Sequence, residues 1–417
     1  MLGAIVGDIV GSRFELNNYR YKDFELFAEG CHVTDDSVMT LAVAKAIMET
    51  RRSAEPSVSG HDFNGDYQQL LSELAVRYMQ GIGRKYPNCG YSRPSSRWIF
   101  NDNPQPYNSL GNGAAMRISP AGFAARTVSE AISLSRAVTA ITHNHEEGIK
   151  GAEATAVAIF LARHGCLKSE IRDRISEDYY PLDFTIDEIR PTYKFSGTCP
   201  ETVPQAIECF LESGSFEDAI RTAISLGGDS DTIGAIAGAI AEAYYGVPDD
   251  IRDRALTYLD DQLRAIYGEW EEFVGKDSFR FKVLTKYIDE FAADSPYGTW
   301  LRGGENEWSF VGYDRLVIKF EDEFDQFAES HPEYQLTSYG EILDRNGLKW
   351  DNAQMRKATT DNLDAQCVLA LIMGAIRAER FCNGALLEFF NDGYILKWLK
   401  RLREIDCQAT PKKFSEI

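Results

Sequence analysis

Apolar residues recur every three or four positions over most of the chain between residues 37 and 245. This spacing places them on one face of an α-helix, which turns once every 3.6 residues. Alternating apolar and polar runs, which indicate strands, are few. The pattern predicts an all-α first domain with helices over residues 37–48, 67–79, 129–141, 148–163, 204–212, 216–225 and 232–245.

Two short segments are built from small residues. Residues 3–11 read Gly-Ala-Ile-Val-Gly-Asp-Ile-Val-Gly, and residues 234–239 read Gly-Ala-Ile-Ala-Gly-Ala. The first segment invites comparison with a dinucleotide-binding loop, but the spacing G-x-G-x-x-G is not present. A small-residue helix packed in the core and followed by the acidic residue Glu15 is the better prediction. The second run would likewise let helix backbones pack closely.

Residues 81–120 form a long stretch rich in glycine, proline, asparagine and serine. Loops of this length inside a compact domain are usually functional or disordered. The stretch also carries five aromatic residues, which argue against disorder. We therefore predict a loop that lines a ligand.

A linker-like stretch follows Phe291, so we predict a first domain over residues 1–292 and a second over 306–417. In the second domain, residues 363–380 have the pattern of an amphipathic helix. Residues 386–390 and 394–399 flank Asn391-Asp392-Gly393 and fit either a hairpin or two helices, of which we favour helices. The second domain matches no known chemistry, and docking, dimerisation or regulation are its candidate roles.

Composition narrows the classes of function. The chain has 417 residues, 44% of them hydrophobic and 26% charged, and a net charge of -20, which makes charge-driven binding to nucleic acid unlikely. It has no apolar stretch of membrane-spanning length and no basic segment typical of a secretion signal, so we expect a cytoplasmic enzyme. Its eight cysteines are scattered without a C-x-x-C pair, so we expect reduced thiols rather than disulfides or a zinc site.

Two acidic clusters carry the clearest chemistry. Each stands at the start of a predicted helix, and each combines two carboxylates with hydroxyls: Thr34-Asp35-Asp36-Ser37 and Asp229-Ser230-Asp231-Thr232. Either cluster alone fits a helix N-cap. Together they would supply hard oxygen ligands for Mg²⁺, Mn²⁺ or Ca²⁺ rather than zinc. From the residues alone, caps and a metal site remain equally open.

Two weaker features complete the set of candidates. Residues 109–117 form a Gly/Asn-rich turn that could present N–H groups to phosphates, although a plain turn is the commoner meaning. His143 and His145 are too close in sequence to share one face of a helix. At most one of them is expected to point at a ligand.

In this order, the motifs resemble the ADP-ribosylglycohydrolase family over residues 3–248. They are residues 7–15, the cluster beginning at Thr34, residues 111–117, His143, and residues 227–232. The resemblance implies an all-α fold with a centre of two Mg²⁺ ions, sometimes Mn²⁺, at the base of an ADP-ribose cleft. Ser37 stands where the family usually has a threonine and keeps the hydroxyl.

The resemblance also implies roles for individual residues. The metal ligands would be Thr34, Asp35, Asp36, Asp229, Asp231 and Thr232. The catalytic group would comprise Glu15 near the scissile bond together with Asp35 and Asp36. The substrate would be bound by Ser109, Gly111, Asn112, Gly113 and His143.

The implied reaction is hydrolysis of the glycosidic bond between ADP-ribose and an acceptor, which reverses ADP-ribosylation of a protein or a small molecule. Three alternatives remain open, one of which is a structural protein with well-capped helices and no metal. The chain could hydrolyse another ADP-ribose derivative or a phosphoester, since paired metal ions also serve phosphoryl chemistry. It could also be a binding protein for ADP-ribose or a partner that performs no catalysis.

Overall fold

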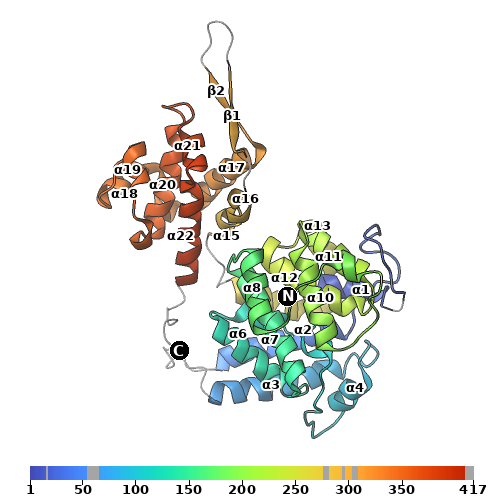
Figure 1. The fold of residues 1–417 in the computed structure, drawn as a ribbon. Helices are drawn as coiled ribbons and strands as arrows, with labels where there is room; N and C mark the ends of the chain where they lie inside the picture. The colour runs from blue at the N-terminus through green and yellow to red at the C-terminus, as the bar shows by residue number, and fades with distance from the viewer. Residues whose placement is uncertain (16, 54–64, 276–280, 294–295, 303–308, 409–417) are drawn as a thin grey trace. The chain divides into compact units, whose positions relative to one another are not determined.

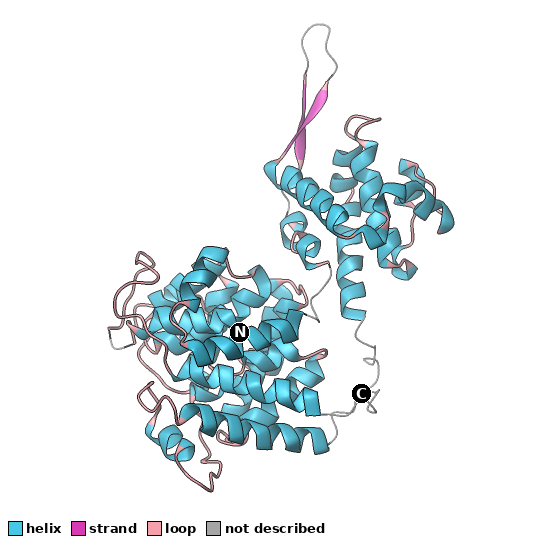
Figure 2. Ribbon diagram, turned by 180° about the vertical axis from the view of Figure 1, so that it is seen from behind, coloured by secondary structure: helices cyan, strands magenta, loops and turns pink. Residues whose placement is uncertain are grey.

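The structure, a computed structural model, describes residues 1–15, 17–53, 65–275, 281–293, 296–302 and 309–408. The chain divides into two units, residues 1–278 and 279–417. Regular structure in both is nearly all helical (Figures 1 and 2), so the predicted all-α class with a mainly helical second domain is confirmed. Among the described residues, no helix is long and apolar enough to cross a membrane.

The helices of the first unit follow the predicted spacing closely. They are α1 (Leu2–Ser12), α2 (Asp35–Ser53), α3 (Gly65–Gly83), α4 (Arg93–Ile99), η1 (Asn112–Ala114), α5 (Ser119–Ala124), α6 (Val128–Thr139), α7 (Glu146–Arg163), α8 (Lys168–Asp178), α9 (Ile186–Ile189), α10 (Cys199–Leu211), α11 (Phe216–Leu226), α12 (Ser230–Tyr245), α13 (Asp249–Leu256) and α14 (Asp261–Gly275).

Helix α12 runs through the interior of this unit. Helices α1, α7, α10 and α11 all pack against it, and every residue from Ser230 to Ala241 is buried. A helix with apolar residues on all sides is stable only when other elements surround it. The acidic cluster that begins at Asp229 therefore lies at the N-terminus of a central helix and not at a surface cap.

The segment predicted as a loop over residues 81–120 contains helix α4. Ser92 caps this helix, because its Oγ accepts a hydrogen bond from the Ser95 N–H at 3.3 Å. Pro94 follows in the first turn, where its missing N–H costs nothing. A loop without regular structure over the whole segment was predicted, and this was wrong at α4 because a single helix of seven residues gives little periodic signal.

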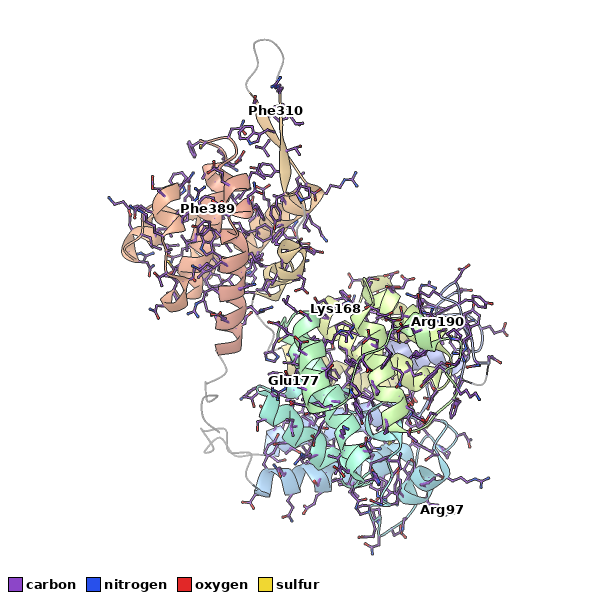
Figure 3. All side chains as sticks on the ribbon, viewed as in Figure 1. Arg97, Lys168, Glu177, Arg190, Phe310 and Phe389 are labelled. Carbon is purple, nitrogen blue, oxygen red and sulfur yellow. The ribbon has the colours of Figure 1, made fainter. Side chains whose placement is uncertain are left out.

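The second unit consists of short helices and one hairpin. Its elements are α15 (Lys282–Thr285), α16 (Ile288–Ala292), β1 (Gly298–Leu301), β2 (Phe310–Tyr313), α17 (Arg315–Ser330), η2 (Pro332–Tyr334), η3 (Leu336–Ser338), α18 (Tyr339–Arg345), α19 (Asn352–Arg356), η4 (Thr360–Asn362), α20 (Ala365–Ala378), α21 (Ala385–Asn391) and α22 (Tyr394–Gln408). The two strands are antiparallel, with Trp300 opposite Val311. Phe310 lies on the hairpin and Phe389 among the helices (Figure 3). The choice of helices over a hairpin for residues 386–399 is confirmed.

The two units divide earlier than the predicted boundary at residues 292 and 306, and residue 306 lies outside the described residues. Aromatic packing explains the difference. The rings of Tyr287 and Phe291 each lie 5.3 Å from Phe320 of α17, and Phe291 lies 4.9 Å from Phe390 of α21. Residues 281–292 thus belong to the core of the second unit.

The second unit also contains a partly buried carboxyl group, Glu321 on α17. Burial, and then the nearby Asp325 and Glu379, raise the pKa of Glu321 to about 7. An acid whose pKa is raised by folding destabilises the fold increasingly as the pH rises from its unfolded pKa to its folded one. Glu321→Gln should therefore leave the melting temperature of the second unit unchanged at pH 4 and raise it at pH 8, as measured by calorimetry. An equal change in melting temperature at both pH values would contradict the raised pKa of Glu321.

Candidate metal and substrate site

Two glycine-bearing helices bring distant parts of the chain into contact at the site. Helix α1 packs along α12, and a Cβ added at Gly7 would lie 2.0 Å from the carbonyl oxygen of Gly234. Ser230 at the start of α12 donates from its Oγ to the Gly11 carbonyl oxygen at 2.9 Å. Because the two backbones touch, the end of α1 and the start of α12 lie together.

The turn into α12 depends on two further glycines. Gly227 and Gly228 have φ angles of +70° and +74°, which residues with a side chain rarely adopt. The Gly228 N–H donates to Asn18 Oδ1 at 3.1 Å. This turn delivers Asp229 to the space beside Glu15.

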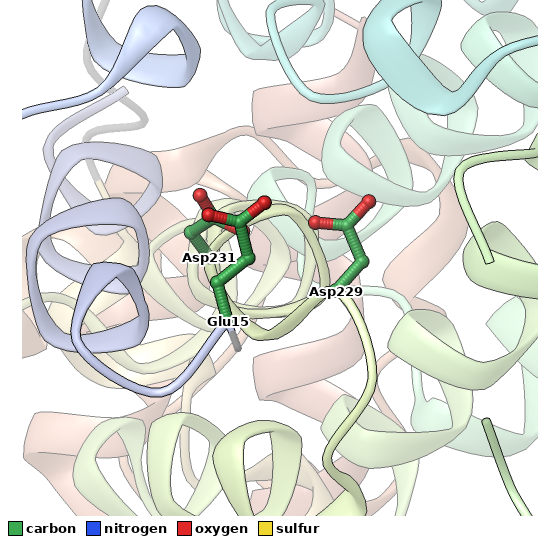
Figure 4. A group of neighbouring side chains, drawn as sticks. All are labelled: Glu15, Asp229 and Asp231. Carbon is green, nitrogen blue, oxygen red and sulfur yellow. The ribbon is translucent and has the colours of Figure 1, made fainter. Parts of the chain in front are cut away.

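Three carboxyl groups meet where α1 and α12 come together. Glu15, Asp229 and Asp231 each offer an oxygen within 4.8 Å of the others, and Figure 4 shows their carboxyl groups turned to the same side. Asp229 and Asp231 are buried and Glu15 is half-buried. Oxygen atoms at this spacing can ligate one metal ion. Glu15, predicted to lie near the scissile bond, is therefore also within reach of the same ion as the two aspartates.

The first acidic cluster lies at the start of α2 and faces the second. Burial and then Asp36 and Asp229 raise the pKa of Asp231 well above its ordinary value. The Thr232 hydroxyl lies close enough to Asp36 and Asp229 to lower the pKa of both. The two clusters, which are almost 200 residues apart in sequence, thus form one group of carboxylates.

A carboxylate that the sequence prediction did not assign organises the first cluster. Asp8 on α1 is fully buried. Its oxygens accept hydrogen bonds from the Thr34 Oγ1 at 2.6 Å, from the N–H groups of Thr34 and Ser37 at 3.1 Å, and from the Ser37 Oγ. The signal available in the sequence was one acid within an otherwise apolar helix. The hydroxyl retained at Ser37 has its partner here.

The electrostatics of the cluster favour a bound cation. Burial raises the pKa of Asp35 to about 7, with further contributions from Asp8, Asp229 and Glu15. The Oδ1 of Asp36 is buried without a hydrogen-bond partner among the described residues. Within the same part of the chain, no ion pair involves any of these carboxylates. An unpaired buried charge is costly, so the cluster fits a metal ion, and its all-oxygen donor set suits a hard divalent cation.

The predicted substrate loop is tied directly to the acidic cluster. Gly111 pairs with Thr198 in an isolated bridge, and the Asn112 N–H donates to the Gly197 carbonyl oxygen at 2.9 Å. The Asn112 Nδ2 donates to Asp229 Oδ2 at 2.7 Å. Ser109 Oγ accepts from the Gly111 N–H at 3.0 Å and shapes the turn. The loop therefore borders the metal candidates through Asn112.

His143 lies against this loop, whereas His145 caps α7. A Cβ added at Gly111 or Gly113 would lie 3.5 or 3.4 Å from His143 Nε2, within ordinary van der Waals contact, so the imidazole packs directly beside the loop. Burial, and then the nearby Arg117, lower the pKa of His143 well below its usual value. The imidazole is therefore neutral near pH 7. The five predicted substrate residues thus lie together around one loop, which Asn112 joins to Asp229.

A pocket opens beside Asp35, and the sequence prediction did not assign most of its lining to a site. Three of the aromatic residues in segment 81–120 lie in its wall, in agreement with a ligand-lining role for that segment. The lining residues are Asp35, Met39, Met79, Tyr91, Ser95, Trp98, Ile99, Tyr107, Met116, Arg117 and Thr142. Phe100 of the same segment is instead exposed.

Comparison with protein families assigns both units. Residues 1–278 match the model of a family described as ADP-ribosylglycohydrolase. The chain belongs to the ADP-ribosylglycohydrolase family. Membership confirms the resemblance and the predicted enzyme class, a hydrolase. Residues 277–407 match a family of unknown function, DUF6508.

The individual relatives of this chain are distant in sequence. ADP-ribosylhydrolase ARH3 of Bos taurus is 26% identical and aligns with 59% of this chain and 84% of its own length. ADP-ribosylarginine hydrolase Tri1 of Pseudomonas putida (strain GB-1) is 27% identical, over 59% and 70%. ADP-ribosyl-[dinitrogen reductase] glycohydrolase of Rhodospirillum rubrum is 27% identical, over 55% and 74%. A solved structure titled ADP-ribosylglycohydrolase-related protein complex has 23% identity and a TM-score of 0.45, and covers 66% of this chain and 97% of that one.

Proposed function

We propose that this chain is a metal-dependent hydrolase that releases ADP-ribose from an ADP-ribosylated protein or small molecule. The observation that supports this most is the group of carboxylates at the meeting of α1, α2 and α12, beside the Gly111–Gly113 loop. The relatives named above are hydrolases of ADP-ribosyl groups. A binding protein without catalysis would have no use for so many converging, unpaired acids.

The proposed cofactor is a pair of Mg²⁺ ions, for which Mn²⁺ can substitute. Thr34, Asp35, Asp36, Asp229, Asp231 and Thr232 would hold the ions. When bound, the ions would orient the ribose hydroxyls and lower the pKa of a water.

The chain's own residues supply the remaining functions. Cleavage at the anomeric carbon passes through an oxocarbenium-like state, and a nearby carboxylate can stabilise it or transfer a proton. The half-buried position of Glu15 beside Asp229 and Asp231 supports this role for it. Asn112 fixes Asp229 through its Nδ2, and the loop at Gly111 and Gly113 would contact the pyrophosphate and ribose.

Metal removal gives the direct test of the proposal. After treatment with EDTA, the rate of ADP-ribose release should fall by at least about 100-fold, and Mg²⁺ should restore it. The rate would be measured on peptides carrying arginine-linked or serine-linked ADP-ribose. Full activity in EDTA would contradict metal dependence. Binding of ADP-ribose without release from any substrate would instead favour a binding protein, and hydrolysis of phosphoesters alone would favour the other alternative.

Asp8→Asn tests the organisation of the first cluster. The Asp8 carboxylate accepts four hydrogen bonds from Thr34 and Ser37. Asparagine has only one acceptor oxygen and cannot accept all four. Loss of such a supporting group should weaken divalent-ion affinity by about 10- to 100-fold. Calorimetric titration with Mg²⁺ measures this effect, and unchanged affinity would show that Asp8 has no part in shaping the site.

A further inference from the structure

An arginine without an acidic partner lies behind the substrate loop. Arg117 is only 3% exposed. Its Nη2 donates to Thr142 Oγ1 at 2.6 Å, and its Nε is buried without a partner among the described residues. None of the ion pairs formed by those residues includes it. Asp35 lines the same pocket and opposes part of the lowering of the Arg117 pKa by burial, but it forms no ion pair with Arg117. A buried guanidinium without an ion pair costs stability.

Thr142 connects this arginine to His143. Its Oγ1 contacts three groups: Arg117 Nη2 at 2.6 Å, His143 Nδ1 at 2.8 Å, and the Thr139 carbonyl oxygen at 3.2 Å. A hydroxyl has one proton and two lone pairs, and a guanidinium can only donate. The Thr139 carbonyl oxygen also accepts from the N–H groups of Thr142 and His143, at 3.1 and 2.9 Å. The three contacts of Oγ1 are all hydrogen bonds in one arrangement only, in which this carbonyl shares a third proton. The hydroxyl proton goes to Thr139, and His143 Nδ1 carries a proton that it donates to Thr142.

The other imidazole nitrogen then has no proton. His143 Nε2 faces the loop at Gly111 and Gly113, so the side of the ring that faces this loop accepts hydrogen bonds. The groups that face this ring are the Arg117 cation, the Thr142 hydroxyl and the phenol of Tyr107, whose ring centroid lies 5.4 Å from that of the imidazole. Arg117 and burial both oppose protonation of His143. Burial raises the pKa of Tyr107, which keeps its phenol neutral.

We infer that Arg117 is a positioning residue, which acts through Thr142 to hold His143 with its proton on Nδ1 and its Nε2 as an acceptor toward the substrate. The substrate group that meets Nε2 must be a donor. In an ADP-ribosyl compound the donors on the sugar are ribose hydroxyls, whereas pyrophosphate oxygens only accept. This identification of the ligand rests on the proposed function, but the state of the imidazole does not.

The hydroxyl of Thr142 provides a matched pair of variants. Thr142→Val keeps the branched shape and removes Oγ1, and Thr142→Ser keeps the hydroxyl. Arg117→Met keeps most of the volume and removes the donor. Neutral histidine in water prefers the proton on Nε2, and the hydrogen bond to the other nitrogen decides the tautomer in a protein. Thr142→Val should therefore shift His143 to the Nε2-protonated form, and Thr142→Ser should retain the Nδ1-protonated form.

The measurement is a two-bond ¹H–¹⁵N spectrum of the full chain labelled with ¹⁵N-histidine, in which His143→Asn identifies the signal. Wild type is expected to show the proton on Nδ1, and Arg117→Met should show a mixture of tautomers. In turnover, Arg117→Met and Thr142→Val should raise KM about tenfold and change kcat by less than about threefold, because a binding contact is weakened. Thr142→Ser should behave as wild type.

The possible outcomes distinguish a failure of the inference from a failure of the proposed function. A proton on Nε2 in wild type would overturn the inference, as would an Nδ1-protonated His143 in Thr142→Val. Nε2 protonation in the ADP-ribose complex would indicate a phosphate partner and would also overturn it. If wild type has the expected tautomer but releases no ADP-ribose, the proposed function fails and the acceptor role of Nε2 stands. If Arg117→Met does not fold, the comparison of Thr142→Val with Thr142→Ser still tests the inference.

Discussion

Asp231→Asn is expected to lower the rate of ADP-ribose release by at least about 1000-fold and, in metal-free protein, to raise the melting temperature by about 2–4 °C. The two effects have one cause. Burial and the nearby Asp36 and Asp229 raise the pKa of Asp231, so its negative charge destabilises the metal-free fold at neutral pH. Asparagine removes that charge together with a metal ligand.

The substitution should not disturb the local backbone. Asp231 Oδ1 accepts a hydrogen bond from the Thr232 N–H at 3.0 Å, and the amide oxygen of asparagine can accept the same bond. The variant should therefore fold and bury the same surface. A mutation that merely damaged the fold would lower activity and melting temperature together.

Thermal melts with and without Mg²⁺ complete the test. A ligand at 100 times its Kd stabilises the folded state by about 2.7 kcal/mol, so wild type should melt higher with Mg²⁺ and Asp231→Asn should gain much less. Asp183→Asn, which changes an exposed acid of the same unit, should alter neither rate nor melting temperature. Equal Mg²⁺ stabilisation of Asp231→Asn and wild type would disprove the ligand role of Asp231.

Gly7→Ala is expected to destabilise the first unit by about 3 kcal/mol. The added methyl would lie 2.0 Å from the Gly234 carbonyl oxygen, so the two helices must move apart. Gly3 opposite Gly238 and Gly11 opposite Asp231 are packed as tightly, and α1 therefore cannot slide to a new position. The free energy of unfolding would be measured by urea titration.

Activity should fall more than stability does. Separation of α1 from α12 moves Asp8 and Glu15 away from Asp229 and Asp231, and a displacement of about 1 Å can cost about 100-fold in rate. Gly268→Ala is the matched control, because nothing lies within 4 Å of a Cβ at this position of α14. Alanine should stabilise that helix by up to about 1 kcal/mol without loss of activity. Similar effects of both substitutions would exclude close packing as the reason for Gly7.

Much of the first unit could be predicted from local patterns. Helical spacing identified α2, α3, α6, α7, α10, α11 and α12, and small residues identified α1 as a packed helix. The acidic clusters were found because each stands at a helix start, where paired carboxylates and hydroxyls exceed what a cap requires. The order of motifs then indicated the family.

The remaining features depend on contacts that no local pattern contains. The hydrogen bonds that Asp8 accepts from Thr34 and Ser37, and the bond that Arg117 donates to Thr142, join residues that are neighbours only after folding. The hairpin has strands of only four residues each, which is too short for alternation to stand out. The predicted end of the first unit rests on the linker-like stretch after Phe291, whereas the packing of Tyr287 and Phe291 against α17 is seen only in the folded chain.

The crossing of α1 and α12 has a consequence for how the enzyme matures. This pairing joins residues more than 200 positions apart, and long-range contacts of this kind slow folding because a large loop must close first. Until α12 has been synthesised, α1 has no partner for its glycine face, and Asp8 and Glu15 have no second acidic cluster to meet. A nascent or partly unfolded chain therefore lacks the site altogether. Enzymatic activity should appear as a single late event in refolding, and its recovery would report that the first unit has reached its complete native topology.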